Sequence, residues 1–131
     1  MKEVLDFLKQ CGTFYLATSE DGQPHVRPFG AVCEYEGKLY IVTNNQKKVY
    51  RQMLHNPKVE ICGMNKGRWI RVEGEVELDD RREARVAMME DNKAALSSMY
   101  TVDDNLMVVF RFTHATATIY SFTSEPEVYT L

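Results

Sequence analysis

Two spacings of hydrophobic residues alternate along the chain and indicate its helices and strands. Near the N-terminus the apolar positions follow helical spacing, which predicts a short amphipathic helix that ends at Gly12. Residues 68–78 alternate instead, with apolar side chains such as Val72 on one face and charged ones such as Glu73 on the other. This pattern predicts a half-exposed strand.

Runs of β-branched and aromatic residues between short turns predict the other strands. We expect strands over residues 13–18, 24–35, 39–43, 59–64, 68–78, 106–113 and 115–122. Two further helices are expected, over residues 46–55 and from Asp79 or Asp80 to about Ser98. The turns at Asp21-Gly22 and Glu36-Gly37 make the first three strands antiparallel neighbours.

The order of these elements predicts a mainly β protein. Six or seven strands joined by hairpins, with inserted helices, are typical of an antiparallel barrel rather than a parallel α/β sheet. No glycine-rich turn joins a strand to a helix, which leaves a Rossmann or P-loop site unsupported. We expect residues 1–131 to form one domain.

Composition excludes several functional classes. A net charge of −3 offers no electrostatic case for binding nucleic acid or an anionic membrane. The N-terminal MKEVLDFLKQCG resembles neither a signal peptide nor a membrane span, so we expect a cytoplasmic protein. The three cysteines form no CxxC pair and are expected to be free and buried, and no spacing of His and Cys suggests a metal site.

Four features follow one another in a fixed order. Arg27-Pro28-Phe29-Gly30 lies within the second strand, and Tyr40-Ile41-Val42-Thr43 ends the third. Gln46-Lys47-Lys48 then opens a helix, and the segment from Trp69 to Gly74 begins the alternating strand. This order resembles the pyridoxamine 5′-phosphate oxidase-like family of FMN-binding split barrels, clearly over residues 13–78 and loosely to residue 122.

The resemblance implies a six- to seven-stranded antiparallel split β-barrel with Greek-key topology, paired as a homodimer with FMN at the subunit interface. It implies that residues 27–32 run along the isoalloxazine ring, with Arg27 approaching the phosphate. The cofactor-binding residues implied in this way are Arg27, Pro28, Phe29, Gly30, Ala31, Val32, Val42, Thr43, Lys47, Lys48 and Trp69.

Residue chemistry agrees with a phosphate near Thr43. A phosphate carries nearly two negative charges, and the start of a helix offers free N–H groups and a positive dipole end. Lys47 and Lys48 are unfavourable there without an anion, although taken alone they are a common solvated pair. By the resemblance, Trp69 lies near the position where the partner subunit touches the flavin, in contact with the interface or the flavin; its alternative role is a barrel-core or rim aromatic.

Two functions remain open at this point. One is a flavin-dependent oxidoreductase that transfers electrons between a donor such as NAD(P)H and a small molecule, with no catalytic residue identified. The other is a protein that holds FMN or haem without turnover; haem needs an axial histidine, for which only His25 is suitably placed. Pyridoxamine phosphate is not an expected substrate, because Val32 replaces a basic residue of the family and no arginine follows Arg111.

Overall fold

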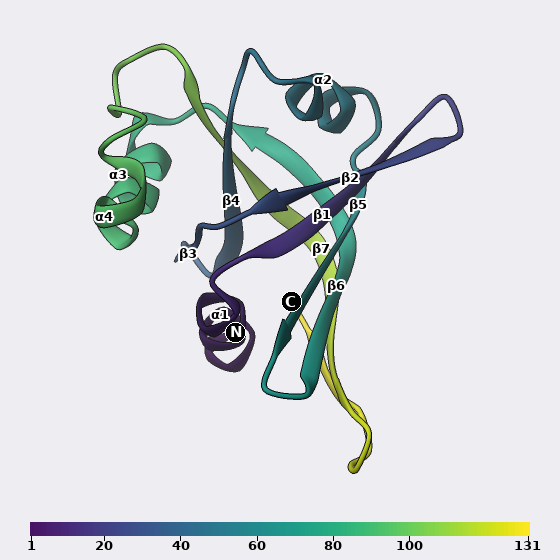
Figure 1. The fold of residues 1–131 in the computed structure, drawn as a ribbon. Coiled ribbons are helices and arrows are strands. Elements are labelled where there is room, and N and C mark those ends of the chain that lie inside the picture. Colours follow the sequence, from purple (N-terminus) through teal and green to yellow (C-terminus); the bar gives the residue numbers. More distant parts are fainter.

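The computed structural model describes all residues, 1–131, as eight strands and four helices. In chain order they are α1 (Lys2–Cys11), β1 (Phe14–Glu20), β2 (Gln23–Phe29), β3 (Val32–Tyr35), β4 (Lys38–Asn44), α2 (Lys48–His55), β5 (Lys58–Asn65), β6 (Arg68–Asp79), α3 (Arg82–Asp91), α4 (Lys93–Leu96), β7 (Met107–Ser121) and β8 (Glu127–Thr130). Every pairing between strands is antiparallel. The expected mainly β, antiparallel split-barrel fold is confirmed (Figure 1).

The sheet closes around itself but leaves one opening. The strands follow the order β2-β1-β5-β6-β7-β4-β3, and β8 pairs with β7 outside this path. β2 and β3 stand at the two ends of the path and do not pair with each other, although only Gly30 and Ala31 separate them in the chain. The barrel is therefore split where the chain passes from β2 to β3.

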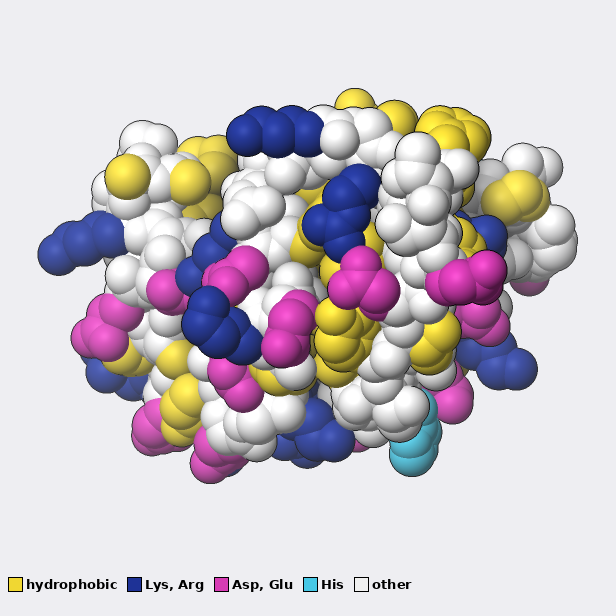
Figure 2. All heavy atoms as spheres, turned by 90° about the horizontal axis from the view of Figure 1, so that it is seen from below, with side chains coloured by type: hydrophobic (Ala, Val, Ile, Leu, Met, Phe, Trp, Pro, Cys, Tyr) yellow, Lys and Arg dark blue, Asp and Glu magenta, His cyan; other side chains and the backbone are white.

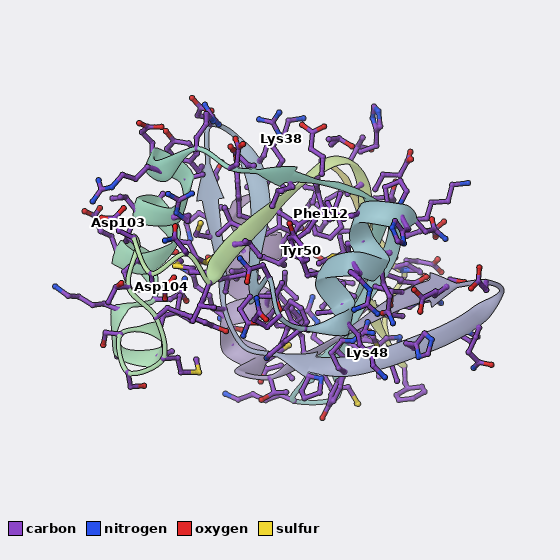
Figure 3. The ribbon with its side chains drawn as sticks, turned by 90° about the horizontal axis from the view of Figure 1, so that it is seen from above. Lys38, Lys48, Tyr50, Asp103, Asp104 and Phe112 are labelled. Atoms are coloured by element: carbon purple, nitrogen blue, oxygen red, sulfur yellow. The ribbon has the colours of Figure 1, made fainter.

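The interior of the barrel is the larger of two hydrophobic cores. Strand side chains such as Phe14, Ile70 and Phe112 pack there with Phe7 of α1 and Met53 of α2. The two helices lie at opposite ends of the barrel, α2 near the top and α1 at the lower left of Figure 1. In the view from above, Tyr50 of α2 and Phe112 of β7 lie at the centre (Figure 3). Each helix thus covers one end of the barrel with its apolar face.

A second core lies outside the barrel, where α3 and α4 cover β3, β4 and β7 (Figure 1). Met88 and Leu96 of these helices pack against Tyr40 and Val42 of β4. Because Ile41 faces the first core, β4 is buried on both faces. This strand is held by packing on both sides, which fixes the position of Thr43 near its end.

Several expected boundaries were wrong. The strand expected over residues 24–35 is two strands, since the chain changes sheet edge at Gly30. The strands expected over residues 106–113 and 115–122 are one, β7, because a bulge opposite Glu75 and Val76 absorbs the irregularity inside the strand. A Cβ at Gly74 would lie 2.1 Å from a β7 carbonyl oxygen, so this close approach requires glycine.

Two further expectations also need correction. The helix expected to end at about Ser98 begins at Arg82 and is interrupted at Asn92, whose side chain donates a 2.9 Å hydrogen bond to the backbone oxygen of Val32. The cysteines are all free, but only Cys33 is buried and Cys62 is exposed. Cys62 is exposed because strand alternation directs it away from the barrel interior.

The surface carries charges of both signs. On the face seen from below, which carries α1, lysine and arginine side chains lie among aspartate and glutamate without a patch of one sign (Figure 2). The hairpin of β7 and β8 extends beyond the barrel in Figure 1. None of the helices combines the length and the apolar character that crossing a membrane would require.

Candidate functional site

A cavity of about 340 Å³ lies at the opening between β2 and β3. Its volume falls in the range of roughly 300–1,000 Å³ that is common for small-molecule sites. Three separate parts of the chain that the sequence singled out meet here. They contribute Pro28, Phe29, Gly30 and Ala31 from β2 and the turn after it, Val42 and Thr43 from β4, and Lys47 from the start of α2.

Four of the expected site residues do not line this cavity. Val32 is buried in the barrel core at 1% exposure. Lys48 is the first residue of α2, and Arg27 lies beside this helix, where it bonds to Gln52. Trp69 lies at the beginning of β6, on the outer face of the sheet. Val32 cannot reach a ligand in the cavity with its side chain, because that side chain points into the first core.

The sequence did not single out the residues that complete the wall. Thr13 contributes from the junction of α1 and β1, and the rest come from α4 and the turn after it. These are Ala95, Leu96, Met99 and Tyr100. The spacing of Leu96, Met99 and Tyr100 is that of one helical face, a signal that indicates a packed surface but does not say what it covers.

The end of the cavity beside α2 contains unpaired hydrogen-bond donors. Thr43 is 4% exposed, yet its hydroxyl has no hydrogen-bond partner in the protein and borders the cavity. Helix α2 starts at Lys48 after Lys47, which provides no side-chain cap, and no acidic residue lies in its first turn. The first N–H groups of a helix need acceptors, so this end is suited to an anion.

The positive charges near α2 have no carboxylate partner. Lys47, Lys48 and Arg27 take part in none of the ion pairs of the structure. Lys48 and Gln52 are four residues apart and share a face of α2, and Lys48 lies beside the β2 strand in Figure 3. Arg27 projects from β2 toward the same face, where it bonds to Gln52.

Arg27 is held by neutral acceptors. Its Nη1 donates to the Thr18 hydroxyl at 2.8 Å, and its Nη2 donates to the Gln52 side-chain oxygen at 2.6 Å. Burial lowers the pKa of the guanidinium, because the charged form loses water without gaining a counter-ion. Arg27 therefore adds positive potential beside α2, although it does not line the cavity.

The remaining wall is mostly apolar and suits a flat ring. Phe29, Ala31, Val42, Leu96 and Met99 present carbon surfaces to the cavity. An apolar stretch that ends in phosphate donors matches the chemistry of FMN, whose ring is planar and whose side chain ends in a phosphate. The residues present fit this cofactor: Thr43, Lys47 and the start of α2 would hold the phosphate, and the apolar wall would hold the ring.

Trp69 lies in an aromatic cluster away from the cavity of its own chain. Its ring stacks on Tyr120 with centroids 5.4 Å apart and meets Phe122 at 5.0 Å. Phe122 is 87% exposed, and Met64, which pairs with Trp69 in the β5–β6 ladder, is 63% exposed. The cluster belongs to a larger apolar surface on the outer face of the sheet.

We call this surface the outer face and define it by side chains that alternate outward along β2, β1, β5, β6 and β7 and by Phe122, which follows β7. They are Val26, Pro28, Tyr15, Cys62, Met64, Trp69, Tyr120 and Phe122. Neighbours on adjacent strands connect them, as Tyr15 pairs with both Pro28 and Cys62. Soluble monomers rarely expose connected apolar patches of more than a few hundred Å².

None of the three histidines lines the cavity. His25 shares the half-buried face of β2 with Arg27, as the alternation of the strand requires, and its backbone oxygen accepts a hydrogen bond from Arg27. The structure thus leaves His25 close to Arg27 and outside the cavity wall.

Known proteins resemble this chain in sequence as well as in fold. The family model described as pyridoxamine 5′-phosphate oxidase matches residues 1–119. A NimC/NimA family protein from Clostridium acetobutylicum is 57% identical, with a TM-score of 0.94, and the match covers 100% of this chain and 93% of that one. Among proteins with curated functions, none matches this chain.

More distant structures share the fold alone. General stress protein 26 from Bacillus anthracis is 20% identical, with a TM-score of 0.76 over 99% of this chain and 97% of its own. A pyridoxamine 5′-phosphate oxidase-related, FMN-binding protein from Nostoc punctiforme is 16% identical, with a TM-score of 0.65 over 99% of this chain and 93% of its own.

Proposed function

Because the chain belongs to the pyridoxamine 5′-phosphate oxidase family, we propose that it binds FMN in the cavity between β2 and β3 and acts as a flavin-dependent oxidoreductase. The observation that carries the proposal is the Thr43 hydroxyl, buried, without a protein partner and open to the cavity beside the uncapped start of α2. A phosphate supplies the acceptors that this end lacks.

The roles of the residues follow from their places. Thr43 donates its hydroxyl to the phosphate, and Lys47 adds a charge-assisted bond. Lys48, which does not line the cavity, adds positive charge at the start of α2. Phe29 and Val42 hold the ring by apolar contact and keep water from one side of it. FMN, when bound, supplies the transfer of a hydride or of single electrons, and the protein orients it.

We further propose that two chains assemble into a two-fold dimer through the outer face. The face is apolar and aromatic, and its Arg71 is already paired with Glu60 of the same chain at 2.5 Å. Aromatic residues and arginine are enriched at such interfaces. The open side of the cavity would then be closed by the partner, with Trp69 near the partner's flavin.

The arrangement of histidines favours FMN over haem. A haem in this cavity would need an axial ligand, and the histidine that the sequence offered, His25, is not in the wall. The donors beside α2 suit one compact phosphate, whereas haem has no phosphate. A flavin carrier without turnover would have the same cofactor site, so only a measurement of activity distinguishes it from an oxidoreductase.

The absorbance of the purified protein tests the cofactor, and anaerobic addition of NAD(P)H tests turnover. We expect a flavin spectrum with one FMN per chain, and bleaching by NAD(P)H that a small organic acceptor reverses. A haem spectrum would contradict the cofactor, and bound flavin that no reduced nicotinamide bleaches would contradict that electron donor.

The preference for FMN over riboflavin tests the phosphate end separately. Lys47→Ala should lower the affinity for FMN about tenfold or more, since a charge-assisted hydrogen bond contributes ~1.5–3 kcal/mol. The affinity for riboflavin should stay unchanged. Lys58→Ala, an exposed lysine on β5, is the matched control and should change neither. Equal losses for both flavins in Lys47→Ala would rule out this phosphate site.

A further inference from the structure

Tyr100 has a hydroxyl to which the proposed function gives no role. It follows α4 and lines the cavity. Its oxygen accepts a hydrogen bond from the side-chain amide of Asn44, with 3.1 Å between Nδ2 and Oη. No protein group accepts the Tyr100 proton, so the hydroxyl remains a free donor at the cavity wall.

The orientation of Asn44 determines which atom donates in this pair. The Asn44 Oδ1 accepts the backbone N–H of Gln46 at 2.9 Å, which requires an oxygen at that position. The amide nitrogen of Asn44 therefore faces Tyr100, and an NH₂ group can only donate. The Tyr100 oxygen is the acceptor, and its own proton is available to another group.

This free donor stands at the α2 end of the cavity. Asn44 directly follows Thr43, and Gln46 directly precedes Lys47. The amide that holds Tyr100 thus lies between the two residues that the proposed function gives to the phosphate. Phosphate oxygens only accept hydrogen bonds and need several donors.

Resting on the proposed function, we infer that the Tyr100 hydroxyl donates a hydrogen bond to the phosphate of FMN. Tyr100 is then a further ligand-binding residue, supplied by the segment that covers the cavity rather than by β4 or α2. It is a neutral donor beside Lys47, and its position is set by Asn44.

The same contact connects the covering segment to the cofactor. Asn45 binds the loop after Tyr100 twice: its backbone N–H donates to the Leu106 oxygen at 3.0 Å, and its side chain donates to the Asn105 oxygen at 2.8 Å. Residues 93–106 are therefore attached to the turn that leads into α2. A phosphate that binds both the turn and Tyr100 stabilises this segment against local opening, whereas riboflavin does not.

The test compares FMN with riboflavin in wild type, Tyr100→Phe and Tyr50→Phe. Tyr100→Phe removes one oxygen and keeps the ring in the wall. We expect FMN affinity to fall about tenfold and riboflavin affinity to stay within about twofold, as for loss of one bond to a charged group. Tyr50→Phe makes the same chemical change on α2, outside the cavity wall, and should change neither affinity.

Hydrogen exchange of residues 93–106 is a second readout that requires no activity. In wild type, FMN should slow exchange there and riboflavin should not; in Tyr100→Phe, FMN should lose this effect. The ratio of FMN to riboflavin affinity cancels any general loosening of the cavity by the substitution.

The outcomes separate the inference from the proposed function. If Lys47→Ala lowers the ratio of FMN to riboflavin affinity and Tyr100→Phe leaves both this ratio and the exchange unchanged, the inference about Tyr100 alone is overturned. If neither variant changes the ratio, the phosphate site itself is wrong. Equal losses of both flavins in Tyr100→Phe would show a contact to the ring and would also overturn the inference.

Discussion

The guanidinium of Arg27 donates a 2.6 Å hydrogen bond to the side-chain oxygen of Gln52, a residue that is only 2% exposed. The same oxygen accepts the Thr18 hydroxyl, also at 2.6 Å. A half-buried positive charge on β2 is thus joined to β1 and α2 through one neutral amide. No carboxylate takes part, which leaves the positive charge of Arg27 without a counter-ion beside the second turn of α2.

Gln52→Leu should destabilise the protein by ~1.5–3 kcal/mol, because it leaves a buried charged donor without its acceptor. The midpoint of urea unfolding measures this change. Gln23→Leu, on exposed β2, is the matched control and should stay within ~0.5 kcal/mol. Equal midpoints for the two variants would show that the Gln52 bond contributes nothing.

Thr43→Val should lower FMN affinity without lowering stability, whereas Thr18→Val should lower stability. Thr43→Val removes a hydroxyl that binds nothing in the protein, so stability should hold while FMN affinity falls about tenfold. Thr18→Val removes a hydroxyl bonded to Arg27 and Gln52, so stability should fall by ~1 kcal/mol or more. Urea unfolding and flavin titration measure the two quantities. A Thr43→Val protein that binds FMN like wild type would contradict the role given to Thr43.

Met64→Glu should convert the proposed dimer into a monomer. Met64 is 63% exposed on the outer face, so a charge there costs a single chain little but would be desolvated in the interface. Sedimentation equilibrium at micromolar protein, with FMN stoichiometry in the same sample, measures the outcome. Leu54→Glu on α2 replaces a side chain of similar exposure, 47%, away from the outer face and should stay dimeric. A wild-type monomer that binds FMN fully would contradict the interfacial site.

Asp79 should make stability depend on pH in the acid range. Hydrogen bonds from Arg81, and from the Tyr40 hydroxyl at 2.6 Å, lower the pKa of this carboxyl, although its burial opposes them. A lowered pKa in the folded state gives stability that is complete above the unfolded value of about 4 and is lost as pH falls through the folded value.

Asp79→Asn should therefore be less stable than wild type at pH 7, and the difference should shrink as pH falls below about 4. Urea unfolding at steps between pH 3 and pH 7 measures it. Asp80→Asn, whose carboxylate makes no hydrogen bond, is the control and should run parallel to wild type. If the difference in stability between Asp79→Asn and wild type were the same at every pH, Asp79 would not be the cause of the pH dependence.

Pyridoxamine 5′-phosphate should be a poor substrate despite the family. Val32, where the resemblance implies a basic residue, is 1% exposed in the barrel core. A phosphorylated substrate therefore lacks that charged partner. The rate of pyridoxal 5′-phosphate formation measures this, and efficient, saturable turnover would show that other residues bind the substrate phosphate.

Part of the fold and of the candidate site could be predicted from local signals. The alternation over residues 68–78 and the turns at Gly22 and Gly37 indicated antiparallel strands, and the structure has them. The break at Gly30 and the continuity of β7 through His114 were not predicted, because each depends on which strand lies alongside. The sequence of one strand does not by itself identify the strand that pairs with it.

The sequence by itself determined the class of the fold and most of the cavity residues on β2, β4 and α2, because strand periodicity, turn chemistry and an ordered set of motifs are all readable along the chain. Only the tertiary structure decided that Arg27 bonds to Gln52 and does not line the cavity, and that Val32 faces the core. It also brought Tyr100 to Asn44, 56 residues away in the chain. Contacts of that kind arise from the packing of α4 on β4, and side-chain packing between distant elements depends on the whole fold at once.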